Sequence, residues 1–280
     1  MNPNQGSLSK PLNSLVKRES PDRPDRLDRL ERPGRVDRVD ALRGFAMLWM
    51  TVFHFCFDLN NFGYIQQNFY TDPVWTWQRT CILSLFLFTA GFSQAVAVSQ
   101  GQNWPRFWRR WSQIAVCALL VTAGSYWMFP KTFIYFGVLH GMLVMLVVVR
   151  FTARWGLWLW LLGAMMVAAG WFAGLLTLPA DVTHLLNSKS LNWIGWVTRK
   201  PQTEDFVPLI PWLGVMWWGA AAGAWAMRSN AQWLRSPLAA APVVWRGLAT
   251  LGRWSLSYYM LHQPILIGGL MGWAWVAGLR

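Results

Sequence analysis

The sequence predicts an all-α protein of the polytopic membrane class, a helix bundle with about seven transmembrane helices. Of its 280 residues, 54% are hydrophobic and only 13% are charged, whereas a soluble domain carries about 25% charged residues. Runs without any charged residue divide the chain, and a helix needs about 20 apolar residues to cross the hydrocarbon layer. The seven runs span residues 44–57, 80–105, 111–130, 132–149, 155–180, 206–227 and 254–279.

Six of these runs contain 18 to 26 residues and are long enough to cross a membrane as they stand. The first run has only 14 residues. Its helix must therefore extend outward, over Val36–Ala41 on one side or Leu59–Asn61 on the other. Because backbone groups in lipid must be satisfied within their own segment, we predict a helix for each run.

The basic residues predict the orientation. Nine arginines fall in the loops on the side of the N-terminus: Arg106, Arg109, Arg110, Arg150, Arg154, Arg228, Arg235, Arg246 and Arg253. The opposite side has six basic residues: Arg79, Lys131, Lys189, Arg199, Lys200 and Arg280. It also has all five acids beyond residue 40: Asp58, Asp72, Asp181, Glu204 and Asp205. The positive-inside rule favours a cytoplasmic N-terminus and an outer C-terminus.

Residues 1–35 are predicted to form a flexible, charged cytoplasmic tail. Residues 22–40 read DRPDRLDRLERPGRVDRVD, a mixed-charge repeat that is typical of a flexible segment, and the first 35 residues lack the apolar core of a signal peptide. The basic residues are scattered between apolar runs, so we do not expect nucleic-acid binding. The three cysteines, in apolar stretches without zinc-ligand spacing, indicate neither a disulfide framework nor a metal site.

Ionisable residues inside the predicted spans are the functional candidates, because a charge in lipid is costly. His54 lies eleven residues after Arg43, about 16 Å along a helix, so Arg43 is expected near the inner face and His54 in the outer half. Asp58 follows His54 by four residues, and both then face one side of the helix. A carboxylate beside an imidazole orients a general base. A hydrogen bond that only caps or packs a helix end is the alternative.

Two further histidines fall near the middle of predicted spans. His140 lies in the fourth run, and His262 lies in the seventh with Tyr258 and Gln263 beside it. Three histidines on three helices could meet in one polar cavity, and interhelical hydrogen bonds would explain His140 and His262 equally well. His184 lies in a loop and is given no role. The chain contains no P-loop, GxSxG or HExxH motif.

Five segments carry a family resemblance: RVDALRGFAMLWMTVFHFCFDLNNFGY, LFLFTAGFS, FGVLHGM, IPWLGVMWWG and LGRWSLSYYMLHQPILI. In this order they resemble the heparan-alpha-glucosaminide N-acetyltransferase catalytic-domain-like family of bacterial membrane proteins, over about residues 36–275. The spacing from Arg43 to His54 is also similar to the arginine, ten residues, histidine pattern of membrane acyltransferases that O-acetylate surface polysaccharides.

The resemblance implies that residues 36–280 form an acyltransferase-like domain of a bacterial inner membrane. It would move an acetyl or other acyl group from cytoplasmic acyl-CoA, the co-substrate, to a saccharide-type amine or hydroxyl, without a metal. Carried over by position, His54 is the catalytic residue, with Asp58 beside it. Lysosomal members carry their catalytic histidine in the loop after the first span, whereas the loop 58–79 contains none. The identity of the acceptor is therefore not carried over.

Carried over by position, Arg43 would contact the donor from the cytoplasmic side, and the chemistry of donor and acceptor points to further binding residues. The CoA phosphates need cations at the inner face, and the arginines placed there are Arg43, Arg109, Arg110 and Arg253. The residues expected on the acceptor side are His140, His262, Tyr258 and Arg79. The expected partners are the lipid bilayer, the acyl-CoA donor and a saccharide or cell-envelope acceptor, and a homodimer is left open. Two alternatives are a transporter or flippase of a polar or saccharide solute without acyl-transfer chemistry, and a haem-binding electron carrier that uses two of the span histidines.

Overall fold

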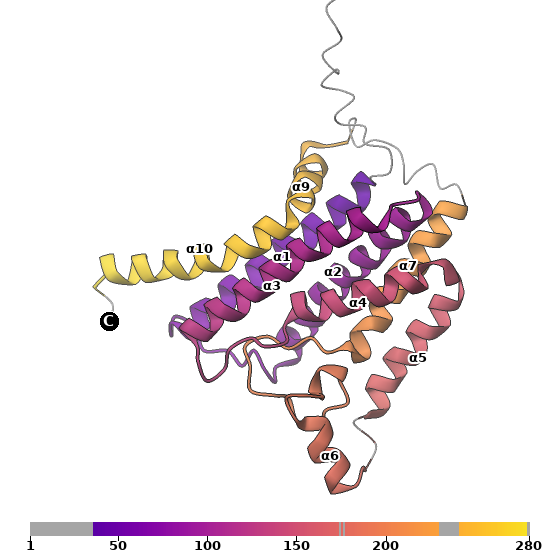
Figure 1. Ribbon diagram of the computed structural model, residues 1–280. Helices are drawn as coiled ribbons and strands as arrows, with labels where there is room; N and C mark the ends of the chain where they lie inside the picture. Colours follow the sequence, from indigo (N-terminus) through magenta and orange to yellow (C-terminus); the bar gives the residue numbers. More distant parts are fainter. Residues whose placement is uncertain (1–35, 174, 176, 230–240, 279–280) are drawn as a thin grey trace, which may run out of the picture. The chain divides into compact units, whose positions relative to one another are not determined.

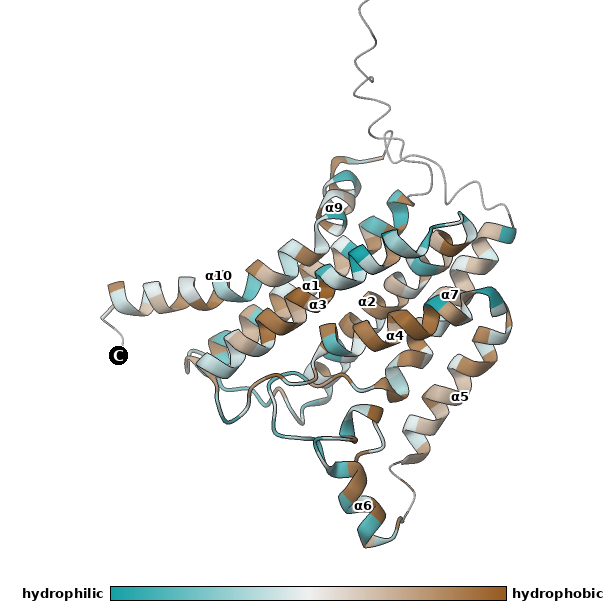
Figure 2. Cartoon of the chain, in the orientation of Figure 1, coloured by the Kyte–Doolittle hydropathy of each residue, from teal (hydrophilic) through white to brown (hydrophobic). Residues whose placement is uncertain are grey.

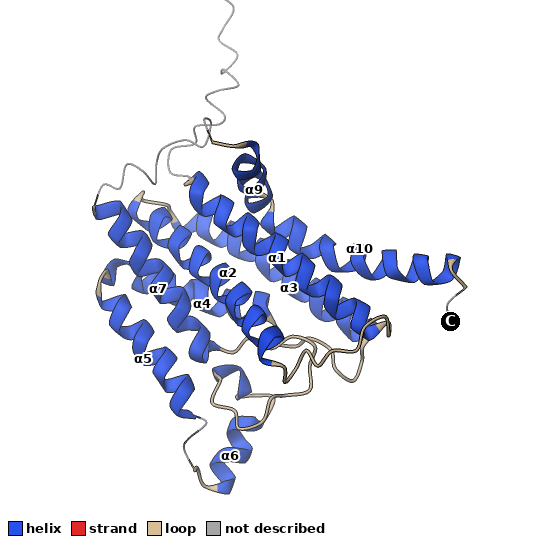
Figure 3. Cartoon of the chain, turned by 180° about the vertical axis from the view of Figure 1, so that it is seen from behind, coloured by secondary structure: helices blue, strands red, loops and turns tan. Residues whose placement is uncertain are grey.

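The computed structural model describes residues 36–173, 175, 177–229 and 241–278, and the regular elements in these ranges are helical (Figures 1 and 3). One isolated parallel bridge joins Phe136 to Phe206. The tail 1–35, Arg235 and Arg280 lie outside the described residues. The elements are α1 (Asp37–Asn61), α2 (Pro73–Ser99), α3 (Trp104–Met128), α4 (Val138–Thr152), η1 (Ala153–Trp155), α5 (Trp158–Ala173), α6 (Ala180–Asn187), η2 (Asn192–Ile194), α7 (Leu209–Arg228), α9 (Val243–Arg253) and α10 (Ser255–Val276).

The helices follow the charge-free runs and confirm the all-α fold class. The first run lies within α1, which extends beyond it at both ends. The other six runs contain most or all of α2, α3, α4, α5, α7 and α10. By length and hydropathy, α1, α2 and the segment Val138–Trp155 of the described chain are able to cross a membrane, and α5 is a shorter apolar helix. The total of seven crossings stays a prediction. Hydrophilic residues gather near helix ends and in the connections around α6 (Figure 2).

The core lies where α2, α4 and α7 meet. Leu87, Met145 and Met216 come from these three helices and are fully buried. At one end of this core, Trp217 Nε1 donates a hydrogen bond of 2.9 Å to Thr152 Oγ1. Such a bond is needed because a buried indole N–H without a partner would carry a desolvation cost.

Glycines bring the helix backbones into direct contact. A Cβ added at Gly91 of α2 would overlap the carbonyl oxygen of Met216, and one added at Gly219 of α7 would overlap that of Phe88. The α1–α9 crossing is built in the same way, because a Cβ at Gly252 would overlap the carbonyl oxygen of Asp40. In lipid, the hydrophobic effect does not draw helices together, and small residues at such crossings allow the close van der Waals packing that does.

The loops at the acid-rich end of the bundle are tied to one another. Asp205 Oδ2 accepts a hydrogen bond of 2.7 Å from the backbone N–H of Val138 and so caps α4. Burial raises the pKa of Asp205, although the Val138 N–H and the cations Lys200 and Arg79 oppose that shift. Thr132 Oγ1 donates to Glu204 Oε1 at 2.6 Å, which joins the turn after α3 to the segment before α7.

The helix α10 changes character at Pro264, which lies inside it. Its first half packs on the bundle, and its second half projects away (Figure 1). In that second half Ile265, Trp273 and Trp275 are 66%, 62% and 85% exposed. Exposed apolar side chains all along a helix suit a lipid surrounding.

The glycine crossing between α1 and α9 predicts a difference between two alanine substitutions in one helix. Gly252→Ala should destabilise the protein by about 1–3 kcal/mol, because the new Cβ meets backbone and the helices must separate. Gly247 has open space around it, so Gly247→Ala should be neutral or stabilising by up to about 1 kcal/mol, through helix propensity. Thermal unfolding in detergent measures both, and equal midpoints would contradict this account of the crossing.

Candidate active site

The crossing of α1 and the first half of α10 brings polar side chains together inside an apolar region. His54 and Asp58 come from α1, and Tyr258, His262 and Gln263 come from α10. The ring centroids of His54 and His262 are 5.2 Å apart, with the planes at 59°. Two of the three histidines considered from the sequence therefore lie side by side.

The His262 ring is fixed in place and in its tautomer. Its Nδ1 atom lies 2.7 Å from the carbonyl oxygen of Tyr259. A carbonyl oxygen only accepts hydrogen bonds, so Nδ1 carries the hydrogen and the lone pair is on Nε2. The Tyr258 ring stacks on His262, with centroids 6.0 Å apart and planes at 8°.

Tyr258 is itself anchored to α1. Its hydroxyl lies 2.6 Å from Thr51 Oγ1, and Thr51 Oγ1 donates its one hydrogen to the carbonyl oxygen of Met47 at 2.9 Å. The tyrosine must therefore be the donor in the Tyr258–Thr51 bond. This chain of contacts holds the stacked ring, and through it His262, against α1.

Asp58 has a different partner from the one its spacing predicts. Both carboxylate oxygens accept hydrogen bonds from Gln263 Nε2, at 2.9 and 3.1 Å. Among the described residues no hydrogen bond joins Asp58 to His54. The i, i+4 spacing places the two side chains on one side of α1, but α10 supplies an amide donor that takes the carboxylate.

Three buried atoms at this crossing have no hydrogen-bond partner within the described chain: His54 Nδ1, His262 Nε2 and Gln263 Oε1. Buried polar atoms are normally satisfied, and exceptions call for a functional or solvent explanation. His262 Nε2 and Gln263 Oε1 are acceptors. The crossing is therefore suited to a bound group with hydrogen-bond donors, such as a hydroxyl or an amine.

His140 does not join this pair. Thr122 Oγ1 donates to the carbonyl oxygen of Ile134 at 2.8 Å, so it accepts from His140 Nε2, which lies 3.0 Å away. His140 Nδ1 accepts from the backbone N–H of Gly137 at 3.3 Å. Both ring nitrogens are used, and His140 ties the start of α4 to α3. The expected meeting of three histidines is thus limited to two.

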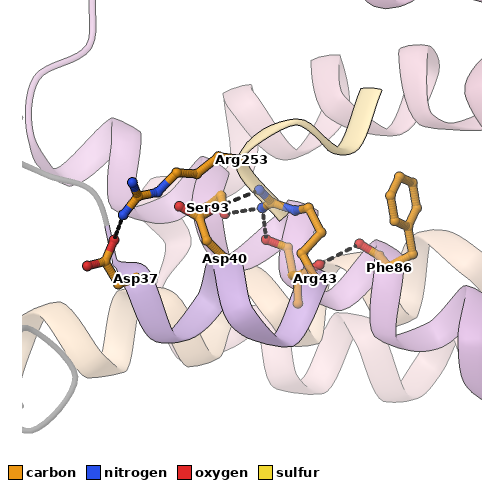
Figure 4. A network of polar contacts seen from close by, with 7 residues as sticks. Asp37, Asp40, Arg43, Phe86, Ser93 and Arg253 are labelled. Atoms are coloured by element: carbon orange, nitrogen blue, oxygen red, sulfur yellow. Dashed lines mark hydrogen bonds and ion pairs between the residues drawn. The ribbon is translucent and has the colours of Figure 1, made fainter. Parts of the chain in front are cut away.

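Arg43 lies in a buried polar network near the start of α1 (Figure 4). Its guanidinium pairs with Asp40 Oδ1 at 3.1 Å and donates to Ser93 Oγ at 2.7 Å. It also donates to the carbonyl oxygen of Thr89 at 3.3 Å. The sequence places Arg43 at the inner end of the span, and the structure adds that it fastens α1 to α2.

Arg253 lies close to the same end of α1, at the end of α9. Its Nη2 atom pairs with Asp37 Oδ1 at 2.7 Å (Figure 4). The side chains of Arg253 and Asp37 are 31% and 28% exposed, against 9% and 6% for Arg43 and Asp40. Arg253 therefore reaches solvent, whereas Arg43 has almost no contact with it.

Arg109 and Arg110 lie on the first turns of α3, and both are exposed. Arg109 lines an open pocket of about 430 Å³ at the α2–α3 turn. The other lining residues are residues 100–103, Pro105 and Arg106. The exposed guanidinium groups of Arg106 and Arg109 at this pocket suit an anionic ligand, and Arg110 is not among the lining residues.

Arg79 lies at the other end of α2, with the charged loop residues. Burial lowers the pKa of Lys200, and the positive charge of Arg79 lowers it further, while Asp205 and Glu204 raise it. Lys200 Nζ also lies 5.3 Å from the centre of the Tyr70 ring. Two cations and two carboxylates thus share this end of the molecule.

A family profile described as heparan-alpha-glucosaminide N-acetyltransferase, catalytic, matches residues 35–264. The chain belongs to this family. No curated protein and no solved structure matches it significantly. Membership of the heparan-alpha-glucosaminide N-acetyltransferase catalytic family makes the chain an acetyltransferase-like protein of the membrane, and the family in general uses acetyl-CoA as donor. The α1–α10 crossing lies wholly within the matched residues.

Sequence reasoning missed three contributors to these sites. Thr51 and Ser93 are single hydroxyls within apolar runs, a signal that is too common to single them out. The third is the carbonyl oxygen of Tyr259, which fixes His262. Because every residue carries a backbone carbonyl, its role depends on helix geometry alone.

The two ion pairs at the start of α1 predict unequal stability effects. Arg43→Gln should destabilise the protein by about 3–5 kcal/mol, because it removes the cation from a buried pair. Arg253→Gln should cost about 1 kcal/mol or less, since its pair is partly solvated. Chemical or thermal unfolding of both variants in one detergent is the measurement. A larger loss for Arg253→Gln would show that the buried network is not what fastens α1.

Proposed function

We propose that this chain transfers an acetyl or other acyl group from acyl-CoA to a hydroxyl or amine of a saccharide-type acceptor. The observation that carries the proposal is the adjacent pair His54 and His262, whose buried nitrogens Nδ1 and Nε2, respectively, lack partners among the described residues. The chain belongs to an acetyltransferase family, and the pair offers the proton acceptor that acyl transfer requires.

The chemistry needs a proton acceptor. A hydroxyl or neutral amine attacks the thioester carbon efficiently only if its proton is removed, and the thiolate that leaves must in turn gain a proton. Histidine is suited to both tasks because its ordinary pKa is near neutrality. In this proposal His54 is a catalytic residue, and Asp58 supports the site through Gln263, to which it is hydrogen-bonded.

The donor is proposed to bind from the basic end of the bundle. Arg106 and Arg109 line the open pocket at the α2–α3 turn, and Arg110 follows Arg109 in α3. Together they offer the CoA phosphates exposed guanidinium groups. Arg253, which reaches solvent at the end of α9, is a further cation for the donor in this proposal. Arg43 mainly holds α1 against α2, because its guanidinium is buried and bonded to Asp40 and Ser93.

The proposed setting is a bacterial inner membrane, with residues 36–280 as the acyltransferase-like domain and the N-terminus in the cytoplasm. The distribution of arginines supports that orientation. Acyl-CoA then reaches the basic end from the cytoplasm, and the acceptor approaches from the end that holds Arg79, Lys200 and the acidic loops. The contact of Lys200 with the Tyr70 ring supports a surface for a polar acceptor there.

The decisive experiment is transfer by the purified protein. Radiolabelled acetyl-CoA is offered with glucosamine, which has an amine and hydroxyls, or with glucose, which has hydroxyls only. Label in either product supports the proposal and identifies the group acylated. If the protein binds glucosamine or glucose but neither binds acetyl-CoA nor forms a product, the transporter alternative replaces it.

His54→Ala should lower the transfer rate by about 10²–10⁴-fold, the usual effect of losing an acid–base group. Acetyl-CoA binding should survive, because the basic end of the bundle is untouched. His184→Ala is the matched control, since His184 is exposed on α6 and has no role in the proposal. Near wild-type transfer by a folded His54→Ala protein would remove His54 from the mechanism.

Loss of exposed cations should instead weaken donor binding. The double substitution Arg106→Ala and Arg109→Ala should raise the Kd for acetyl-CoA by roughly 10-fold or more, since charged hydrogen bonds contribute about 1.5–3 kcal/mol each. Lys131→Ala, in the turn after α3, is the control at the opposite end. Calorimetric titration measures the affinity, and an unchanged Kd in the double variant would place the phosphates elsewhere.

A further inference from the structure

His262 has an arrangement that a general base requires and that His54 lacks. A base needs a nitrogen with a free lone pair and a third group that fixes the ring in the matching tautomer. For His262 the third group is the carbonyl oxygen of Tyr259, 2.7 Å from Nδ1. The lone pair is therefore on Nε2, which is buried and has no partner within the described chain.

His54 has no equivalent support. Its Nδ1 atom is buried and unpartnered in the described chain, and the carboxylate that could have fixed it, Asp58, accepts from Gln263 instead. No hydrogen bond from the described residues selects one tautomer of His54 over the other. A histidine in this state can present either a proton or a lone pair, which suits a residue that accepts a proton in one step and donates it in the next.

From this geometry we infer that His262 is the base that takes the proton of the acceptor, and that His54 is its partner. The inference rests on the proposed acyl transfer and names a second acid–base residue for it. The ring centroids are 5.2 Å apart. Hydrogen bonds are about 2.8 Å long, so one small group can contact both rings, and a proton can pass between them through that group.

The step balances without any other reactant. The hydroxyl or neutral amine of the acceptor gives its proton to His262 Nε2 as its oxygen or nitrogen forms a bond to the acyl carbon. The bond between that carbon and the CoA sulfur breaks, and the sulfur leaves with the electron pair. The histidine pair then returns one proton to the sulfur, so that both rings end as they began and CoA leaves as the thiol.

The anchoring of the ring explains why this nitrogen stays available. Tyr258 stacks on His262 and is tied to α1 through Thr51. The His262 ring therefore cannot turn Nε2 toward another partner without losing this stacking and the hydrogen bond to the Tyr259 carbonyl. His140 shows the opposite case, because Thr122 and the N–H of Gly137 use both of its nitrogens. Of these two span histidines, only His262 keeps an acceptor nitrogen open.

The test uses the full-length protein and the substitution His262→Asn. The asparagine amide can still donate to the Tyr259 carbonyl, but it has no nitrogen at the position of Nε2. Transfer to glucosamine should fall about 10²–10⁴-fold in kcat, with little change in the KM for acetyl-CoA. Hydroxylamine attacks thioesters without a base, so transfer to it should fall at least 10-fold less. His184→Asn, on the exposed face of α6, is the matched control.

A residue with a merely structural role would lower transfer to both acceptors equally, and that result would overturn the inference. So would an unchanged kcat in His262→Asn. If the variant misfolds, a second measurement on the wild-type protein still tests the inference: the nitrogen NMR shifts of its histidines. They should show His262 with the hydrogen on Nδ1, and the other tautomer would refute the assignment. If wild-type protein transfers no acetyl group to any acceptor, the proposed function fails as well, whereas the other outcomes concern His262 alone.

Discussion

Polar groups inside apolar helices must find partners within the protein, and this constraint explains most of the contacts described above. Arg43 is satisfied by a carboxylate, a hydroxyl and a carbonyl oxygen, and both nitrogens of His140 are occupied. Each of these contacts joins two helices or fixes a helix end. Six buried side-chain atoms of the described residues have no hydrogen-bond partner, and three of them, on His54, His262 and Gln263, lie together at the α1–α10 crossing. The other three, on Gln94, Asn192 and Arg253, lie on separate elements. Three open atoms at one crossing suit a ligand better than isolated ones do.

The two ends of the bundle differ in chemistry, and the histidine pair lies between them along α1. Near the start of that helix, Arg43 and Arg253 are paired with Asp40 and Asp37, while the arginines of α3 are exposed. Beyond its end, the loops combine cations with Asp205 and Glu204. The proposed function assigns the anionic donor to the first of these ends and the saccharide-type acceptor to the second. The backbones of α1 and α9 touch at Gly252, and this contact places Arg253 next to the start of α1, where it pairs with Asp37.

Much of the fold could be predicted from the sequence, since charge-free runs locate helices in any protein whose backbone must be satisfied within each segment. The site could be predicted only in part. The spacing of His54 and Asp58 correctly placed both on one side of α1, but it could not show that Gln263 of another helix would take the carboxylate. Arg43 was placed at the inner end of the first span as a contact for the donor, whereas its burial against Asp40 and Ser93 was not predicted, because Ser93 is one of many hydroxyls in apolar runs. Partner choice depends on how helices cross, and helix crossings leave little trace in a single sequence.

The use of a backbone carbonyl to fix His262 has a physical reason in this setting. Serine hydrolases fix their histidine with a buried carboxylate, but a carboxylate in the middle of an apolar bundle must be desolvated, and its cost is high unless it is fully paired. The Tyr259 carbonyl fixes the same tautomer without adding a charge. In the proposed transfer, the positive charge would then develop on a ring that has no carboxylate hydrogen-bonded to it. Asp58, the carboxylate of the same crossing, accepts hydrogen bonds from Gln263 instead.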